Sequence, residues 1–270
     1  MDSQVELQPR TRELHAVALA AKALEPQPDP RVEEARGAAM RRLFPKRHAG
    51  RANQAASRAA LRVHAYLAEA KTIEDLERRA RLPLHYPTEL IDEVRLRDGR
   101  SVLVRPVLPP DASMHRAFVQ SMSPATRRNR FHAGVADLPD PVLRYLTEVD
   151  HVDHLALAGE VEEATGARLV AEARWVRRED EPDTADFAIA IADDCQLSGL
   201  GNALLDMLER SAAARGIDRL CGHVLRNNLR MSSWLEARGW RIGHDPTDPG
   251  VVCAELPLVT GAAPVWREAA

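Results

Sequence analysis

The stretch ADFAIAIADDCQLSGLGNALL, residues 185–205, most constrains the fold, because a strand-like apolar segment gives way there to a helix-like one. Two of the chain's 14 glycines, Gly199 and Gly201, lie at this junction. The first N–H groups of a helix lack intrahelical partners and the helix dipole adds partial positive charge, so the junction favours an anion. Glycine also lets a phosphate approach the backbone without meeting a Cβ atom. A tight turn without any ligand would explain an isolated Gly-x-Gly equally well.

Two familiar phosphate-binding motifs do not match this stretch. A Rossmann fingerprint needs a third glycine at position 204, where the chain has Leu204, and it follows the first strand of its fold rather than a late one. A P-loop needs Gly-Lys-Ser/Thr, which is absent. The stretch is therefore suited to phosphates but belongs to neither class.

Hydrophobic periodicity predicts an α/β (α+β) sheet with helical crossovers from Tyr86 onward. Asp98-Gly99 between two alternating runs predicts a β-hairpin. We expect Ser123 and Asp140 to cap helices, and Gly216 and Gly239 to end two others. The expected order is a hairpin at 93–107, helices at 111–122, 123–131 and 140–149, strands at 154–161, 167–177 and 185–193, a helix at 200–216, a strand at 218–225, a helix at 227–239, and strands at 240–245 and 250–258.

The first 85 residues predict an all-helical extension, with Ala-rich helical patterns at 13–25, 32–44 and 52–70 and a short helix capped by Thr72. We therefore divide the chain into an extension (1–85), a folded domain (86–260) and a tail (261–270). Between Glu34 and Glu69 there is no acidic residue but eight basic ones: Arg36, Arg41, Arg42, Lys46, Arg47, Arg51, Arg58 and Arg62. They are either a solvated helix surface or a contact for an acidic partner, a membrane surface or a nucleic acid.

Composition narrows these alternatives. Hydrophobic residues make up 45% and charged residues 29% of the chain, as in folded globular proteins. No apolar run is long enough to cross a bilayer, and the N-terminus lacks the pattern of a signal peptide. Three widely spaced cysteines predict neither disulfides nor a metal site and fit a cytoplasmic protein. We expect neither membrane nor nucleic-acid binding, and we expect any homo-oligomer to form through the N-terminal helices.

The ordered motifs resemble the GNAT family of N-acetyltransferases. In that family a strand leads into Gln/Arg-x-x-Gly-x-Gly/Ala and a helix, and Gln196, Gly199 and Gly201 match this spacing. RNNLRMSSWLEARGW resembles the second half of the fold. VRLRDGRSVLVRPVLPPDA, SMSPATRRNRF and DPTDPGVVCAELPL resemble the bacterial protein lysine acetyltransferases that modify acyl-CoA synthetases. The resemblance covers about Tyr86 to Leu258 and implies a mixed, mostly antiparallel sheet with flanking helices.

The resemblance also implies an acetyl-CoA site. The backbone of Ile189 and Ile191 would pair with the pantetheine arm like an added strand, and Asn228 would either contact that arm or cap its helix. The backbone amides from Leu197 to Asn202 would surround the pyrophosphate. The cofactor-binding residues expected in this loop are Gln196, Leu197, Ser198, Gly199, Leu200, Gly201 and Asn202. Many family members have a basic residue at the position of Ser198, so one phosphate contact is missing here.

Acetyl transfer to an amine needs a base, and the resemblance points to Asp186. It stands where family members carry a Glu in the same strand, and alternation puts it on one face with Ala188 and Ala190. Because aspartate is shorter than glutamate, it either acts through water or is only a hydrogen-bonded structural residue. Leu235 replaces the tyrosine that often protonates the leaving thiolate, so no general acid is predicted.

Other reactive residues fit structural roles better. Cys195 adjoins the loop, but no paired histidine supports a covalent mechanism. His151 and His154 are spaced like a metal pair only superficially, and we expect them to be structural or at the surface.

Three functions remain open at this stage. The first is an acetyl-CoA-dependent protein lysine acetyltransferase, whose substrate would favour an acidic groove. The second is a small-molecule amine acetyltransferase with the same cofactor site, and the third is a non-catalytic acyl-CoA sensor. From Tyr86 onward the chain has 21 Lys/Arg and 29 Asp/Glu, which agrees with an acidic groove.

Overall fold

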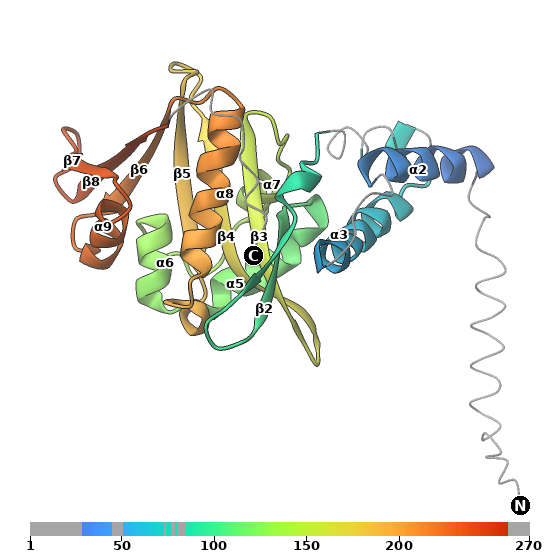
Figure 1. Cartoon of the computed structure of the whole chain (residues 1–270), viewed down its shortest axis with the longest axis horizontal. Helices are drawn as coiled ribbons and strands as arrows, with labels where there is room; N and C mark the ends of the chain where they lie inside the picture. Colours follow the sequence, from blue (N-terminus) through green and yellow to red (C-terminus); the bar gives the residue numbers. More distant parts are fainter. Residues whose placement is uncertain (1–28, 45–50, 73, 77–78, 80–84, 259–270) are drawn as a thin grey trace, which may run out of the picture.

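The computed structural model is built around one eight-stranded mixed sheet (Figure 1). It describes residues 29–44, 51–72, 74–76, 79 and 85–258. The strand order is β1-β2-β3-β4-β5-β6-β8-β7, and every neighbouring pair is antiparallel except β5–β6, which is parallel. The strands are β1 Asp92–Arg95, β2 Ser101–Pro106, β3 His154–Glu163, β4 Gly166–Arg177, β5 Thr184–Ile191, β6 Arg219–Leu225, β7 Arg241–His244 and β8 Val251–Pro257. The predicted α/β (α+β) class, with a mostly antiparallel sheet, is confirmed.

Helices cover both faces of this sheet. Trp175 of β4 donates its indole N–H to Ser211 of α8 at 2.9 Å, whereas its neighbour Arg174 donates to the carbonyl of Leu146 in α7 at 3.0 Å. Successive side chains of a strand point to opposite faces, so α8 and α7 lie on opposite sides. The 3-10 turn η1 Thr88–Leu90 precedes the first hairpin. The helices after this hairpin are α5 Ala112–Ser121, α6 Pro124–Phe131, α7 Asp140–Thr147, α8 Leu200–Ala214 and α9 Leu229–Glu236, with 3-10 turns η2 Pro109–Asp111 and η3 Asp193–Cys195.

The predicted turns and caps agree with the structure at most positions. Gly99, Gly216 and Gly239 all have positive φ, as the hairpin turn and the two helix ends require. The hydroxyl of Ser123 accepts the N–H of Thr126 and caps α6. The expected cap at Asp140 is wrong: Pro139 precedes α7 and Asp140 is its first residue, because proline itself fits the start of a helix.

A helical segment precedes the sheet, as predicted, with α2 Pro30–Leu43 and α3 Arg51–Ala68 (Figure 1). Val32, Val63 and Leu67 form its core, which continues into Tyr86 and Leu108 at the edge of the sheet domain. The hydroxyl of Thr72 accepts the N–H of Asp75, the cap expected there. The helical pattern at 13–25 and the tail at 261–270 lie outside the described residues.

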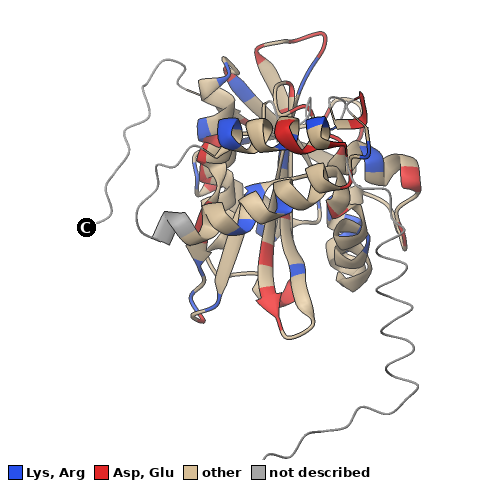
Figure 2. Cartoon of the chain, turned by 90° about the vertical axis from the view of Figure 1, so that its right-hand side faces the viewer, with Lys and Arg blue, Asp and Glu red and all other residues tan. Residues whose placement is uncertain are grey.

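The basic residues of this segment are not simply a solvated surface. Arg36 is buried and donates to the carbonyls of Leu67 and Ala68, which end α3. Arg58 and Arg62 point toward the sheet, where Arg62 lies 3.4 Å from the buried carboxylate of Glu160. Figure 2 shows charges of both signs on this side of the molecule. Part of the basic cluster therefore docks the helices onto the sheet.

Glu160 belongs to a buried ionic network. Arg105, fully buried, makes a bidentate contact of 2.7 Å with Asp111 and a further contact of 3.1 Å with Glu160. Asp111 also accepts the N–H of Leu108, and the arginine and this N–H hold its pKa below the usual range in spite of burial. These bonds join β2, β3 and the start of α5. No helix in the described part of the chain is long and apolar enough to cross a membrane.

His151 and His154 have structural surroundings, as expected. The His151 ring is buried and meets the Tyr86 ring edge-on, with the centroids 5.4 Å apart. Burial, only partly opposed by Asp150, lowers the pKa of His151 to about 3 from its ordinary value of 6.5. His154 lies 2.8 Å from a guanidinium nitrogen of Arg174, and burial together with this cation lowers its pKa to about 4.

We predict that His151 makes the protein sensitive to acid. A group with a lowered folded-state pKa stabilises the fold above its unfolded pKa, and this stabilisation is lost as the pH falls toward the folded value. The free energy of unfolding should therefore decrease as the pH drops from about 6.5 toward 4, by about 1.4 kcal/mol per pH unit for one such group. His151→Phe, which keeps a ring against Tyr86, should flatten this dependence in urea unfolding measured across that range. His64→Phe, at an exposed site, should retain the wild-type slope, and equal slopes for both variants would contradict the prediction.

Candidate functional site

The parallel pairing between β5 and β6 ends early. Register pairs exist only from Thr184 to Asp186 on β5 and from Arg219 to Cys221 on β6. On its other side β5 stays paired with β4 up to Ile191. Among the described strands, none pairs with the β6-facing edge of β5 beyond Asp186, so residues 187–191 present backbone groups to the space between the strands.

Phe187 lies directly after the last register pair. Its ring packs against Trp240 with the centroids 4.4 Å apart. A Cβ atom built on Gly222 would come within 2.2 Å of the Phe187 ring. Gly222 is therefore required for the ring to lie across β6, in the wall of the space where the two strands separate.

A cavity of about 420 Å³ fills this space. The strand β5 contributes one wall, the loop before α8 closes one end, and α6 and α9 complete the sides. Its lining residues are Arg97, Thr126, Asn129, Arg130, His132, Phe187, Ala188, Ile189, Ala190, Ile191, Gln196, Leu197, Gly199, Gly201, Asn202, His223, Val224, Asn228, Arg230, Met231 and Trp234. Most of the residues expected at the cofactor site are thus brought together.

The loop before α8 has the predicted form. Gly199 precedes the helix with φ 97°, a left-handed conformation that favours glycine, and no atom lies within 4 Å of a Cβ built there. In the described part of the chain, no acceptor is found for the backbone N–H groups of residues 197, 198, 199 and 201, whereas the N–H of Asn202 donates to the carbonyl of Gly199. Four amides therefore remain for an anion, and the amide of Asn202 is already used.

Two expected residues do not line the cavity. Leu200 is fully buried in the core, and the hydroxyl of Ser198 donates to the carbonyl of Cys195. These two residues contribute to the loop through their backbone, and their side chains do not face the cavity. Asn202 lines the cavity but also accepts the indole N–H of Trp234 at 2.8 Å, which connects α8 to α9.

Polar side chains fix the loop in place. Gln196 donates to the carbonyl of Ile191 at 3.1 Å and accepts from Arg230 at 2.9 Å. Asp193 accepts from Ser123 and Thr126 at the start of α6, and Asp194 pairs with Arg100 and Arg168. Asp193 and Asp194 therefore anchor the loop to neighbouring helices and strands.

Two arginines at the loop were not predicted. Arg97, in the turn of the β1–β2 hairpin, donates to the carbonyl of Leu197 at 3.4 Å, and its own N–H donates to the carbonyl of Ser198. Arg230, near the start of α9, reaches Gln196. Both line the cavity and bring positive charge to the loop, which lacks a basic residue at Ser198. They come from segments distant in sequence, so the loop motif carries no signal for them.

The ionisable side chains that line the large cavity are basic. Three arginines and two histidines line it, and no Asp or Glu is found among its lining residues in the described chain. Arg130 is held from behind by the buried carboxylate of Glu172 at 3.2 Å. Burial and the neighbouring His223 lower the pKa of His132. The cavity is therefore suited to an anionic ligand.

The structure places Asp186 outside this lining. Its carboxylate is exposed and accepts two hydrogen bonds from Arg178, at 3.0 and 2.7 Å. Its register partner Cys221 and its ion-pair partner Arg178 line a second cavity of about 250 Å³. The other residues lining this second cavity are Gly222, His223, Asp245, Pro246, Thr247, Cys253 and Glu255.

The structure also places the other residues singled out in the sequence, Asn228, Leu235 and Cys195. Asn228 lines the large cavity and its side-chain oxygen accepts the N–H of Met231 at 3.3 Å, so it caps α9. Leu235 is fully buried. Cys195 is also fully buried, and burial together with Asp194 raises the pKa of its thiol, which agrees with the absence of a covalent role.

Comparison with known proteins identifies the family. No family model matches the chain. Acetyltransferase PA5475 of Pseudomonas aeruginosa is 31% identical over 163 residues, which cover 60% of this chain and 87% of that protein. The crystal structure of the GNAT domain of S. lividans PAT superposes with a TM-score of 0.58 and 29% identity, covering 64% of this chain and 99% of that domain. This chain belongs to the GNAT family of acetyltransferases.

A further relative matches over part of its length. Acetyltransferase Pat of Mycolicibacterium smegmatis is 32% identical over 146 residues, which cover 54% of this chain and 43% of that protein. This GNAT chain thus spans less than half of Pat. GNAT N-acetyltransferases take the acetyl group from acetyl-CoA, which is accordingly the acyl donor of this GNAT protein.

We predict that Gly222→Ala will damage the large cavity. The added methyl group would displace the rigid Phe187 ring, and overpacking of this kind costs about 1–3 kcal/mol in unfolding free energy. Calorimetric titration should show acetyl-CoA binding at least about tenfold weaker than in the wild type. Gly134→Ala, at a site with no atom within 4 Å of the new Cβ, is the matched control and should bind normally. Wild-type affinity in Gly222→Ala would contradict the assigned role of Phe187.

Proposed function

We propose that this GNAT protein is an acetyl-CoA-dependent protein lysine N-acetyltransferase, with an acyl-CoA synthetase as the expected class of target. The observation that carries the proposal is that the two cavities share the lining residue His223. The basic large cavity and the second cavity, whose lining includes Asp245 and Glu255, therefore meet at this side chain. An anionic donor and a cationic acceptor would each meet complementary charge.

The residues present fit coenzyme A in the large cavity. The amides of Leu197, Ser198, Gly199 and Gly201 would donate to the pyrophosphate, and Arg97 and Arg230 would add charge there. The edge of β5 at Ile189 and Ile191 pairs with no described strand and would accept the pantetheine arm as an added strand, although the carbonyl of Ile191 already accepts from Gln196. The amide nitrogen of Asn228 would reach the same arm, since its oxygen caps α9.

A lysine acceptor fits the second cavity. An ammonium group would be attracted by the carboxylates of Asp245 and Glu255, and the alkyl chain of lysine would reach past His223 toward the thioester. The resemblance to bacterial protein lysine acetyltransferases supports the same acceptor. In this arrangement the acidic groove expected for lysine is the second cavity, not the large one.

The chemistry would be direct transfer. Asp186 is the proposed base, and because Arg178 already contacts its carboxylate, we infer that the amine proton reaches it through a water molecule. The amine nitrogen then attacks the thioester carbonyl, the C–N bond forms, and the C–S bond breaks to release the thiolate. A free thiol has a pKa of about 8.5, so the thiolate leaves without a general acid, in agreement with Leu235.

The domain division remains part of the proposal. Residues 86–260 would form the catalytic domain, and residues 1–85 the helical extension through which any homo-oligomer would form.

We predict that Arg97→Ala will weaken acetyl-CoA binding. Losing one charge-assisted contact to phosphate should raise the KM for acetyl-CoA by roughly tenfold, equivalent to about 1.4 kcal/mol, with little change in kcat. The effect should shrink as salt is added, because salt screens exposed charges. Arg95→Ala, on an exposed neighbouring strand residue outside the cavity, should leave KM unchanged. An Arg97→Ala variant with wild-type KM at low salt would exclude a phosphate contact.

The acceptor is tested by measuring thiol release from acetyl-CoA with lysine-containing proteins and with small amines, followed by mass spectrometry of acetylated lysines. We expect faster transfer to protein lysines than to small amines. Asp186→Asn should lower kcat by about 10²-fold or more while acetyl-CoA affinity stays unchanged. Asp183→Asn, a nearby exposed carboxylate, is the control. Preferred transfer to small amines would contradict the lysine proposal, and normal kcat in Asp186→Asn would make Asp186 structural.

A further inference from the structure

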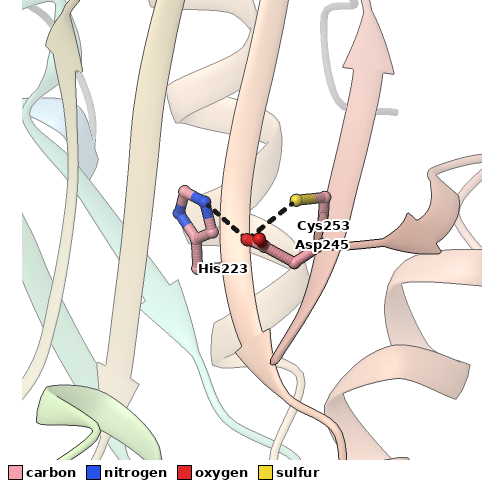
Figure 3. Close-up of side chains that lie close together, drawn as sticks. All are labelled: His223, Asp245 and Cys253. Carbon is pink, nitrogen blue, oxygen red and sulfur yellow. Dashed lines mark hydrogen bonds and ion pairs between the residues drawn. The ribbon is translucent and has the colours of Figure 1, made fainter. Parts of the chain in front are cut away.

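Three potential ligand side chains converge in the second cavity (Figure 3). His223 on β6 and Cys253 on β8 are register partners, so both side chains project from the same face of the sheet. Asp245 follows directly after β7, the neighbour of β8. The convergence is thus fixed by the pairing of three strands rather than by a flexible loop alone.

The distances between the three side chains are close to those between the ligands of one metal ion. The Asp245 carboxylate oxygen lies 3.4 Å from His223 Nε2 and 3.4 Å from Cys253 Sγ. A nitrogen–oxygen separation of 3.4 Å is long for a hydrogen bond. Tetrahedral zinc, with bonds of about 2.0 Å to N and O and about 2.3 Å to S, separates such ligands by about 3.3 Å and 3.5 Å. All three ligand atoms lie within 4.8 Å of one another, and the half-exposed His223 side chain is able to close the remaining gap.

Hydrogen bonds within the protein fix the carboxylate of Asp245 before any ion binds. One carboxylate oxygen accepts the N–H groups of Thr247 and Asp248 and the hydroxyl of Thr247, at 2.7, 3.0 and 2.6 Å. This fixes the other oxygen toward His223 and Cys253. Asp245 is buried, and no Lys or Arg of the described residues lies within ion-pair distance of it. A buried carboxylate without a cationic side chain is the group that a bound cation would neutralise.

We propose that His223, Asp245 and Cys253 form a binding site for a zinc-class transition-metal ion. Imidazole, carboxylate and thiolate together favour Zn²⁺ over Mg²⁺ or Ca²⁺, which take oxygen ligands. Three protein ligands leave a fourth position, which faces the second cavity. Cysteine spacing carries no signal for this cluster, because its members are brought together only by the sheet.

Metal binding at this site would inhibit acetyl transfer. This inference depends on the proposal that the acceptor lysine binds in the second cavity. A divalent cation held by the Asp245 carboxylate and the Cys253 thiolate would bring the charge of the cluster to zero, so the attraction of Asp245 for a lysine ammonium group would be lost. It would leave the anion loop untouched, so acetyl-CoA binding would persist while the acceptor is excluded.

The test is titration of the reduced, metal-free full-length protein with Co²⁺, a spectroscopic substitute for Zn²⁺ that needs neither acetyl-CoA nor an acceptor. We expect one Co²⁺ per chain and a thiolate-to-cobalt charge-transfer band in the near ultraviolet. Cys253→Ser should abolish the band, and His223→Gln and Asp245→Asn should weaken Co²⁺ binding by about 10–100-fold. Cys221→Ser, which removes the other thiol of the same cavity, should retain the band.

Absence of Co²⁺ binding by the folded wild type, or a band that survives in Cys253→Ser, would overturn the proposal. Circular dichroism establishes that each variant is folded. Zn²⁺ should also inhibit acetyl transfer in the wild type and not in Cys253→Ser. A cobalt band without zinc inhibition would retain the metal site and contradict the lysine path instead.

Discussion

The early end of the β5–β6 pairing is the constraint on which the candidate site depends. After Asp186 and Cys221 the two strands separate, while β5 remains fixed to β4 and β6 to β8. The Phe187 ring, lying over Gly222, supports this separation from inside the sheet. The cavity, the unpaired edge of β5 and the position of the loop before α8 all follow from it. A fully paired sheet would have the same loop but nowhere for a pantetheine arm to lie.

The loop is made rigid by groups that do not themselves face the cavity. Asp193 binds the start of α6, Asp194 binds Arg100 and Arg168, and Gln196 connects β5 to α9. Their hydrogen bonds hold the amides of residues 197–201 in one arrangement before a ligand arrives, so less entropy is lost on binding. The same arrangement places Arg97 and Arg230 at the loop. Positive charge thus concentrates where a pyrophosphate would lie.

Local patterns in the sequence predicted most of the fold, because alternation, helical spacing and glycine positions are local properties. The hairpin at Asp98-Gly99 and the Gly199 turn belong to this class. The positions of Arg97 and Arg178 could not be predicted in this way, since each acts on a partner brought near only by the sheet. The same holds for Asp186: its strand was correct, but its pairing with Arg178 depends on the loop that connects β4 to β5. The cluster at Cys253 required the pairing of β6 with β8.

The helical extension and the sheet share a core, which limits how separable they are. Tyr86 and Leu108 pack with Val63 and Leu67 of α3, and Arg62 reaches the buried Glu160. Removing residues 1–85 would therefore expose apolar side chains of the sheet domain. Among the described residues, Arg105 would then be the one remaining ion-pair partner of Glu160. The boundary at residue 85 separates two patterns in the sequence, but the hydrophobic core and the ion pairs extend across it.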